Sequence, residues 1–228
     1  MKTIVVVNTK GGAGKTTIAT NLASALASRF RVLVIDADQK QESSACFFEL
    51  RKSTGMPQAD CVKGTVDMLF KNLMSFSQYD YVVIDAGAGE TDLVRAAIIA
   101  GRYGMLLLPT QASALDVWAT EDTLKLLEQC RALLPGSLEK VYIVLNRVNS
   151  SANITKEAGS AVEELCERFS VGRFKVMLHD RTAYKEAIGE GLNAIEFKGL
   201  RKKLKSAASA AAEIHDLTTE VLEHLEGR

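Results

Sequence analysis

The chain has 228 residues, of which 47% are hydrophobic and 25% are charged. These proportions are those of a soluble globular protein, and the length fits one well-buried domain better than two. Its 28 basic and 28 acidic residues balance, so no global field draws the protein toward nucleic acid or membrane, and any such attraction must come from a local patch.

Short β-branched runs alternate along the chain with longer helical patterns. Most of the runs are continuously apolar, which indicates parallel strands buried on both faces. The predicted strands are Ile4–Val7, Val32–Ile35, Tyr81–Ile84, Met105–Leu108, Val141–Leu145 and Phe174–Leu178. The predicted helices between them are Thr16–Ser28, Thr65–Met74, Asp92–Ala100, Leu115–Leu134 and Thr155–Phe169. This alternation predicts a single α/β domain over residues 1–228, with a doubly wound, mostly parallel sheet flanked by helices.

The C-terminal tail, from Gly199 to Leu225, is predicted as one long helix. If it is broken, we expect the break near the alanine-rich stretch Ala207–Ala212. Residues 198–226 then form a helical segment at the end of the domain.

The first predicted strand leads into a loop rich in glycine and lysine, and the loop opens a helix. It reads Lys10-Gly11-Gly12-Ala13-Gly14-Lys15-Thr16-Thr17. In this setting, glycines let backbone N–H groups turn toward phosphate oxygens, and the helix N-terminus adds partial positive charge. We therefore expect a P-loop that binds ATP, with Lys15 on the β- and γ-phosphates, Thr16 on Mg²⁺ and Thr17 on the α-phosphate. The alternative is a glycine turn that merely joins strand to helix.

Two positions depart from the common phosphate-loop pattern. Thr9 stands where that pattern has a glycine, six residues before Lys15, and a second lysine, Lys10, follows it. With these departures the loop resembles the deviant Walker A box of the ParA/MinD family of ATPases. In that family the extra lysine crosses a dimer interface to the partner's ATP. The resemblance implies a homodimer around two ATP molecules, in which Lys10 is a catalytic cation for the charge that develops on the transferred phosphoryl group.

Acidic residues follow two of the apolar strands, at the edge where ligands bind in an open α/β sheet. The resemblance makes the stretch Val34–Gln39 the first switch. In it, Asp38 would be catalytic, orienting or activating the attacking water, and Asp36 would support the magnesium shell; the alternative is that both acids cap the following segment. Asp85 reads as a Walker B acid that holds Mg²⁺ through a water. Gly87 would offer its N–H to the γ-phosphate. The stretch Tyr81–Gly89, which contains Asp85 and Gly87, would form the second switch. Many family members have two prolines where Ala86 and Gly87 stand here, which leaves the geometry of this switch open.

Two later segments resemble the base-binding elements of the family. Asn146 follows the fifth strand, where related enzymes hydrogen-bond adenine; a turn-forming asparagine is the alternative. The run from His179 to Ala187 resembles the segment R-x-x-Y/F-x-E-A, whose loop closes over the base, so Arg181 is a candidate ATP contact. His179 itself is expected to be a plain loop residue. Trp118, in another stretch that matches ParA-like chains, is expected to pack its helix against the core.

Five basic residues fall within eight positions near the C-terminus, with no acid among them. They are Lys198, Arg201, Lys202, Lys203 and Lys205. If the tail is one helix, this cluster opposes the helix macrodipole, so helix stability does not explain it, whereas contact with DNA phosphates does. A solvated charged face is the alternative. ParA-like proteins bind DNA through this region as ATP dimers, so the resemblance implies non-specific DNA binding that ATP switches on.

The resemblance extends from Met1 to about Glu196 and favours a short ParA-like partition ATPase without an N-terminal DNA-binding domain. We expect slow ATP hydrolysis that a ParB-like adaptor protein stimulates. We also expect a cytoplasmic, nucleoid-associated protein that segregates or positions a plasmid, chromosome region or other large cargo.

Three alternatives stay open. A MinD-like membrane-associated ATPase would need a basic amphipathic C-terminal helix, but this tail is acidic, and no apolar stretch is long enough to span a bilayer. A metabolic enzyme like dethiobiotin synthetase would use ATP in a small-molecule reaction. A metallocluster protein would need grouped cysteines, and those at positions 46, 61, 130 and 166 show no metal-ligand spacing.

Overall fold

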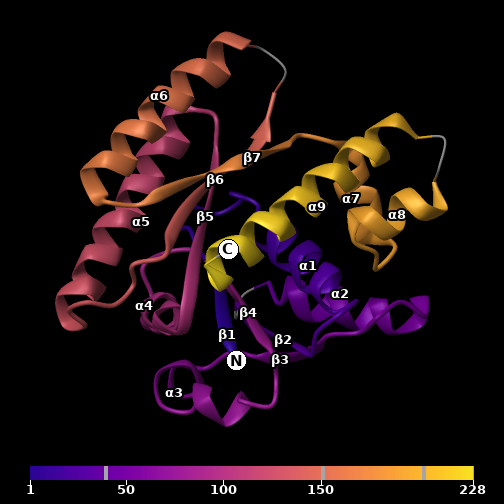
Figure 1. The fold of residues 1–228 in the computed structure, drawn as a ribbon, viewed down its shortest axis with the longest axis horizontal. Coiled ribbons are helices and arrows are strands. Elements are labelled where there is room, and N and C mark those ends of the chain that lie inside the picture. The colour runs from indigo at the N-terminus through magenta and orange to yellow at the C-terminus, as the bar shows by residue number, and fades with distance from the viewer. Residues whose placement is uncertain (39–40, 150–151, 202–203, 228) are drawn as a thin grey trace.

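A computed structural model describes residues 1–38, 41–149, 152–201 and 204–227. This part of the chain forms one seven-stranded sheet between two layers of helices (Figure 1). The strands lie in the order β3-β2-β4-β1-β5-β6-β7, and every neighbouring pair is parallel. They are β1 (Lys2–Val6), β2 (Val32–Ala37), β3 (Asp60–Lys63), β4 (Tyr81–Ala86), β5 (Gly104–Gln111), β6 (Val141–Val148) and β7 (Gly172–His179).

The helices divide between the two faces of the sheet. One face is covered by α1 (Lys15–Leu26), α2 (Ser43–Arg51), α7 (Thr182–Gly189), α8 (Ala194–Leu200) and α9 (Lys205–Glu226). The other face is covered by α3 (Val66–Phe70), α4 (Asp92–Ala100), α5 (Ala114–Leu133) and α6 (Ala152–Phe169). Short 3-10 turns lie at Lys52–Thr54, Leu73–Phe76 and Gly101–Tyr103.

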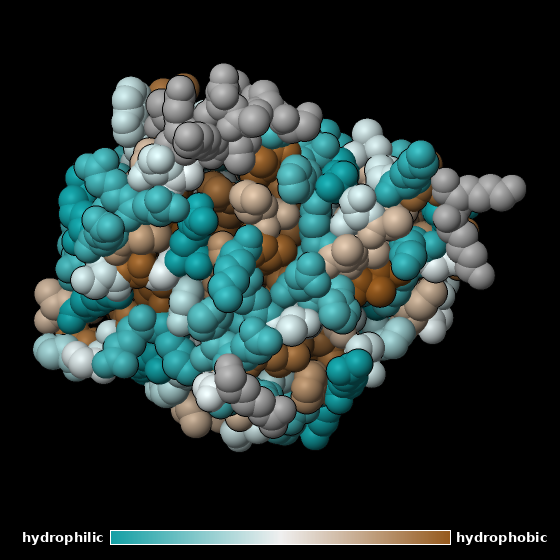
Figure 2. All heavy atoms as spheres, turned by 45° about the horizontal axis from the view of Figure 1, so that its top comes forward, coloured by the Kyte–Doolittle hydropathy of each residue, from teal (hydrophilic) through white to brown (hydrophobic). Residues whose placement is uncertain are grey.

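The sheet separates two hydrophobic cores, and successive strand residues point into them alternately. In β1, Val5 packs into one core while Ile4 and Val6 pack into the other. A strand buried on both faces needs apolar side chains at every position, which is why these runs are continuously apolar. On the face drawn in Figure 2, hydrophilic residues cover most of the surface and hydrophobic ones form smaller areas between them.

The order of strands places the phosphate loop at the topological switch point of the sheet, where the chain passes from strands on one side of β1 to strands on the other. β1 lies between β4 and β5, and the loop follows its carboxyl end, which is where open α/β sheets bind ligands. The prediction of a doubly wound parallel α/β fold is confirmed, and all six predicted strands are present.

Several elements differ from those predicted. β3, α2, α7 and α8 were not predicted, and the helix expected over Thr65–Met74 is instead the short α3 followed by a 3-10 turn. β3 is a four-residue strand at the edge of the sheet, and its first and last residues are charged and exposed. It therefore lacks the apolar run that marks the central strands.

The single C-terminal helix predicted from Gly199 was wrong at its start. α8 ends at Leu200, and Arg201 leaves the helical region with φ −110 and ψ 51. Ala207–Ala212 lies unbroken within α9, where several of its alanines pack into the core. The macrodipole argument then fails for Lys198, which sits in the last turn of α8, where positive charge is favourable, and still applies to Lys205, which begins α9.

In the described residues, none of the helices combines the length and apolar character that crossing a membrane requires.

Candidate functional site

The phosphate loop joins β1 to α1 and needs glycine at its last position. Gly14 caps α1 with φ 95 and ψ 20, a left-handed conformation that other residues adopt at a cost. A Cβ at this position would also lie 2.0 Å from Asn146 Nδ2. That amide donates a hydrogen bond to the carbonyl oxygen of Ala13 at 2.8 Å. Asn146 therefore braces the loop from the end of β6.

Lys15 is buried within the loop, and its Nζ donates to the carbonyl oxygen of Lys10 at 2.9 Å. Burial lowers the pKa of Lys15, while the carboxylates of Asp85 and Asp38 act in the opposite direction. A partly desolvated ammonium beside backbone N–H groups favours a negatively charged ligand, as the P-loop prediction requires.

Asp85, at the end of β4, meets two hydroxyl groups. Thr16 Oγ1 and Ser44 Oγ each donate to its Oδ2 at 2.7 Å. Its Oδ1 is buried without a hydrogen-bond partner among the described residues. Burial raises the pKa of Asp85 to about 7. Ser44 was not predicted, because it follows a short, weakly patterned segment and meets Asp85 only through the fold.

These residues fit a magnesium ion. A carboxylate and a hydroxyl are the hard oxygen ligands that Mg²⁺ takes, and the orphaned Oδ1 would gain a partner from a magnesium-bound water. No group of three or more His, Cys, Asp or Glu side chains suited to a metal lies in the described chain. Mg²⁺ in phosphoryl-transfer sites does not require one, since it is held by one or two protein groups and the phosphates.

Asp36, one strand away, uses both carboxylate oxygens to hold the backbone of the first switch. Its Oδ1 accepts from the N–H of Asp38 at 3.0 Å, and its Oδ2 accepts from the N–H of Ala45 at 2.9 Å. Burial raises its pKa. This favours the capping role named as an alternative in the sequence analysis, and its part in the magnesium shell stays a prediction.

Asp38 and Gly87 line one cavity of about 340 Å³ between the two switches. Asp38 Oδ1 accepts from the N–H of Gln41 at 3.2 Å, and a Cβ on Gly87 would lie 3.1 Å from the carbonyl oxygen of Ala37. Gly87 therefore lets the second switch approach the first. The roles of Asp38 toward water and of Gly87 toward phosphate remain predictions, but the structure brings the two residues together.

Both unusual loop residues contact α5. Thr9 uses its N–H and its hydroxyl on Thr123 Oγ1, each at 3.0 Å. Lys10 Nζ lies 2.7 Å from Asp116 Oδ1, and the Lys10 side chain is 34% exposed. The side chains of the two lysines are thus held apart, because the Lys15 ammonium contacts the loop backbone and the Lys10 ammonium contacts Asp116 on α5. Asp116 had been given no role from the sequence.

The prediction that Trp118 packs into the core is wrong. Its side chain is 61% exposed, and Leu115, one turn earlier on α5, is 65% exposed. The buried side of α5 is formed by residues such as Val117, Leu124 and Leu127, which leaves Trp118 on the outer side.

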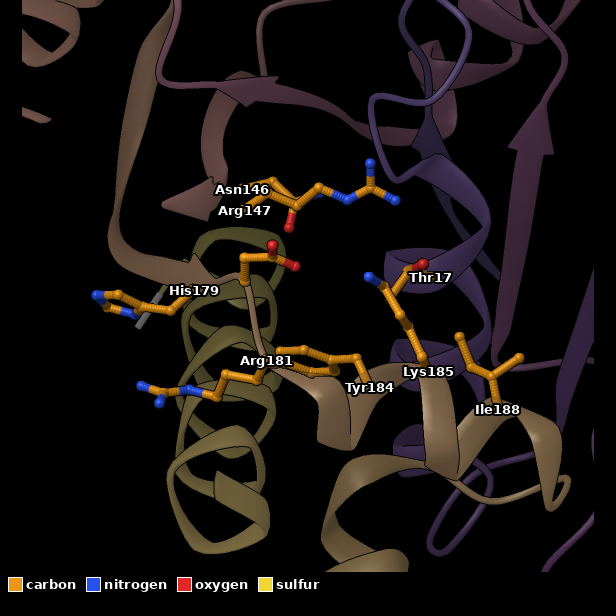
Figure 3. A pocket seen from close by; sticks show the side chains of 9 residues that line it. Thr17, Asn146, Arg147, His179, Arg181, Tyr184, Lys185 and Ile188 are labelled. Carbon is orange, nitrogen blue, oxygen red and sulfur yellow. The ribbon is translucent and has the colours of Figure 1, made fainter. Parts of the chain in front are cut away.

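A second cavity lies beside the loop (Figure 3), and it joins Thr17, which is predicted to contact the α-phosphate, with residues of the predicted base-binding elements. Thr17, Asn146, Arg181 and Tyr184 all contribute to its wall. In Figure 3 the guanidinium group of Arg181 extends away from Thr17, and its Nη2 lies 2.6 Å from Glu213 Oε1. A direct contact of Arg181 with ATP stays a prediction. His179 is not a plain loop residue, because it ends β7.

Three of the five basic C-terminal residues can be placed. Lys198 lies in the last turn of α8, Lys205 begins α9, and Arg201 between them pairs with Glu190 at 2.9 Å. Lys202 and Lys203 lie outside the described residues. We call Lys198, Arg201 and Lys205 the basic junction.

Comparison with known proteins agrees with this geometry. A model of the CobQ/CobB/MinD/ParA nucleotide-binding domain matches residues 4–194. The chain belongs to this family. It is 30% identical to a "Maintenance of carboxysome distribution protein A" from Gloeobacter kilaueensis, over 96% of this chain and 94% of that relative. A protein of the same name from Halothiobacillus neapolitanus is 28% identical, over 96% of each chain.

A solved structure of the septum site-determining protein MinD from Pyrococcus horikoshii, complexed with Mg-ADP, has the same fold. Its TM-score is 0.70 at 18% identity, over 95% of each chain. The chain thus has the nucleotide-binding domain of ParA/MinD-type proteins.

Proposed function

We propose that this protein is a ParA-like positioning ATPase. It forms a homodimer around ATP and Mg²⁺, binds DNA without sequence preference in that state, and is reset by slow hydrolysis that an adaptor protein stimulates. Two relatives are named for carboxysome distribution. This supports a large cargo, such as a protein assembly or a plasmid, that is carried over the nucleoid.

The observation that carries this proposal is the separation of the two loop lysines. Lys15 already supplies the positive charge that one ATP needs within its own loop. Lys10 contacts α5 instead, with its Nζ on Asp116 and its side chain partly exposed. A cation placed at the rim of one site, rather than inside it, is suited to a phosphate bound by a second copy of the chain.

Within each site, the chain's own residues would divide the work. The phosphate loop holds the phosphates, and Asp85 with Thr16 would hold Mg²⁺, which supplies positive charge to the phosphate oxygens. Asp38 would orient the attacking water from the shared cavity between the switches. The partner's Lys10 then adds charge where the transferred group becomes more negative, so hydrolysis would require the dimer.

The test is sedimentation velocity of the protein with Mg²⁺ and either ATP or ADP. We expect a dimer with ATP and a monomer with ADP. Lys10→Ala should abolish the ATP dimer and leave ADP binding unchanged, because ADP binding uses only the chain's own loop. Lys125→Ala is the matched control, since Lys125 is an exposed lysine on α5, and it should dimerise normally.

A second variant tests whether Lys10 must leave its own α5. Asp116→Asn removes the negative partner of Lys10 while keeping the shape of the side chain, so it should dimerise at a lower protein concentration. Because Lys10 is partly exposed, the gain should be at most about tenfold.

Loss of ADP binding in the Lys10→Ala variant would make Lys10 a ligand of its own chain's nucleotide, and this result would refute the shared site.

A further inference from the structure

Glu213, on α9, reaches the wall of the base cavity and binds three residues there. Its Oε1 lies 2.8 Å from His179 Nδ1 and accepts from Arg181 Nε at 3.0 Å and Nη2 at 2.6 Å. Its Oε2 accepts from Tyr184 Oη at 2.8 Å and from the N–H of His179 at 3.2 Å. The Glu213 side chain is only 12% exposed. One nearly buried carboxylate is therefore the common partner of His179, Arg181 and Tyr184.

The three residues form one continuous side of the cavity. His179 ends β7, Arg181 caps α7, and Tyr184 lies in the first turn of α7. The opposite side is made by Thr17 and Asn146, which belong to the phosphate loop's helix and its brace (Figure 3). The position of the first side relative to the second is thus set from outside the cavity, by α9.

The charge of Glu213 is suited to this role. Burial alone would raise its pKa, but the hydrogen bonds from Arg181 and Tyr184 outweigh burial and hold the pKa below its usual value. The group therefore stays ionised and accepts from every donor around it. Charge-assisted hydrogen bonds of this kind are short and directional, so they fix geometry as well as adding stability.

We infer that Glu213 is a positioning residue for recognition of the nucleotide base, an inference that rests on the proposed binding of ATP at this site. It does not touch the nucleotide. It holds the segment from His179 to Tyr184 in place at the side of the cavity. The segment is then already ordered when the base binds, so binding does not have to supply the free energy of ordering it.

Replacement of a carboxylate with a purely structural role would have a different effect on ligand binding. Loss of a structural contact lowers stability and weakens every ligand alike, whereas loss of a positioning contact weakens only ligands that carry a base. The phosphate loop is held by other residues than Glu213: Asn146 donates to Ala13, Gln111 donates to Gly12, and Lys10 pairs with Asp116 on α5. Binding of the phosphates alone should therefore be spared.

α9 offers a matched control two turns further along. Glu220 is 13% exposed and also bonds to β7, accepting from the N–H groups of Lys175 at 2.7 Å and Val176 at 3.1 Å. It resembles Glu213 in burial and in its partner strand, but neither it nor its partners line the cavity. Glu220→Gln thus reproduces the structural loss without the positioning loss.

The experiment is calorimetric titration of wild type, Glu213→Gln and Glu220→Gln with Mg²⁺ and ATP, GTP or inorganic tripolyphosphate. In Glu213→Gln the side chain loses its charge and keeps one acceptor oxygen, so the amide N–H₂ must replace an oxygen that accepts a hydrogen bond and the anchor of the segment is weakened. We expect ATP to bind about tenfold more weakly, the preference for ATP over GTP to shrink, and tripolyphosphate to bind as in wild type. Glu220→Gln should bind all three as wild type does. Thermal melting of each variant verifies that it is folded.

Three results would overturn the inference: equal weakening of ATP and tripolyphosphate in Glu213→Gln, no weakening of either, or the same base-dependent loss in Glu220→Gln. Wild-type protein that binds tripolyphosphate and ATP equally would remove the base site itself. Wild-type protein that binds neither would refute the proposed function, which is a distinct outcome.

Discussion

Asp85 is the residue whose charge state most directly links the site to the stability of the fold. Burial raises its pKa to about 7, although the hydrogen bonds from Ser44 and Thr16 act to lower it. An unfolded aspartate titrates at about 4. Between these values the folded protein holds the proton more tightly than the unfolded chain does. The free energy of unfolding of the metal-free protein should therefore fall as pH rises from about 4 to about 7. Urea unfolding across this range should show a smaller fall in Asp85→Asn, which cannot titrate.

The comparison of the two proteins separates Asp85 from groups with which it does not interact. The pKa of Asp36 is also raised by burial, and its charge in turn raises the pKa of Asp85, so the difference between the two curves reports Asp85 together with its coupling to Asp36. Glu213, whose pKa is lowered, stabilises the fold above the pH at which an unfolded glutamate titrates and loses that effect only in acid. Curves that stay parallel in wild type and Asp85→Asn would show that another group causes the slope. Adding Mg²⁺ and ATP should stabilise wild type more at pH above 7 than below it, since the ion needs the ionised carboxylate.

Among the elements, α2 is tied to the molecule at both ends. Ser44, in its first turn, contacts Asp85 at the magnesium site, and Arg51, its last residue, is fully buried. The Arg51 guanidinium makes two bonds to the carboxylate of Glu196, at 2.6 and 2.8 Å, and also donates to the carbonyl oxygens of Pro57 and Gly191. α2 thus connects the first switch to α8.

Removing Arg51 should be strongly destabilising, because two carbonyl groups lose this donor and the Glu196 carboxylate loses its charged partner, keeping the N–H of Asn193. We predict that Arg51→Ala lowers the free energy of unfolding in urea by about 3–5 kcal/mol. Lys52→Ala is the control, since Lys52 is the next residue and pairs with Glu49 on the exposed surface, and it should unfold at the wild-type midpoint. A loss in Arg51→Ala no larger than in the control would mean that α8 is held by its apolar contacts alone.

The elements that the sequence predicted are those whose signal is local. β1, β4 and β5 are central strands buried on both faces, so their apolar runs identify them directly. β3 was missed because both end residues of this four-residue strand are charged. α2 was missed because two of its four buried positions, Ser44 and Arg51, are polar, although Phe47 and Phe48 keep the spacing of a helical face.

The same division holds in the site. The phosphate loop could be predicted because strand, glycines, lysine and helix are contiguous in the chain. The pairs Ser44–Asp85, Lys10–Asp116 and Arg181–Glu213 join residues far apart in sequence. Their partners are set by how α2, α5 and α9 pack on the sheet, which no local pattern specifies.

For the whole molecule, the distribution of charge decides how DNA binding would work. The formal net charge is zero, so attraction to DNA has to come from a patch such as the basic junction, where Lys198 lies in the last turn of α8 and Lys205 begins α9. Affinity for DNA depends steeply on the number of phosphates contacted, with a salt slope of about −0.9 per contact. A dimer doubles that number, so ATP would increase DNA binding without changing the patch itself.

We predict that wild type with ATP and Mg²⁺ retards DNA of arbitrary sequence at low salt, and that wild type with ADP does so weakly. Lys198→Glu combined with Lys205→Glu should abolish the ATP-dependent retardation while the ATP dimer still forms in sedimentation. Lys52→Glu combined with Lys71→Glu makes the same change in net charge at exposed lysines that directly follow α2 and α3, and it should retain binding. If both double variants lose binding equally, net charge rather than the junction attracts DNA. If neither double variant loses binding, the basic junction is a solvated face, and the ATP dimer binds DNA through another surface.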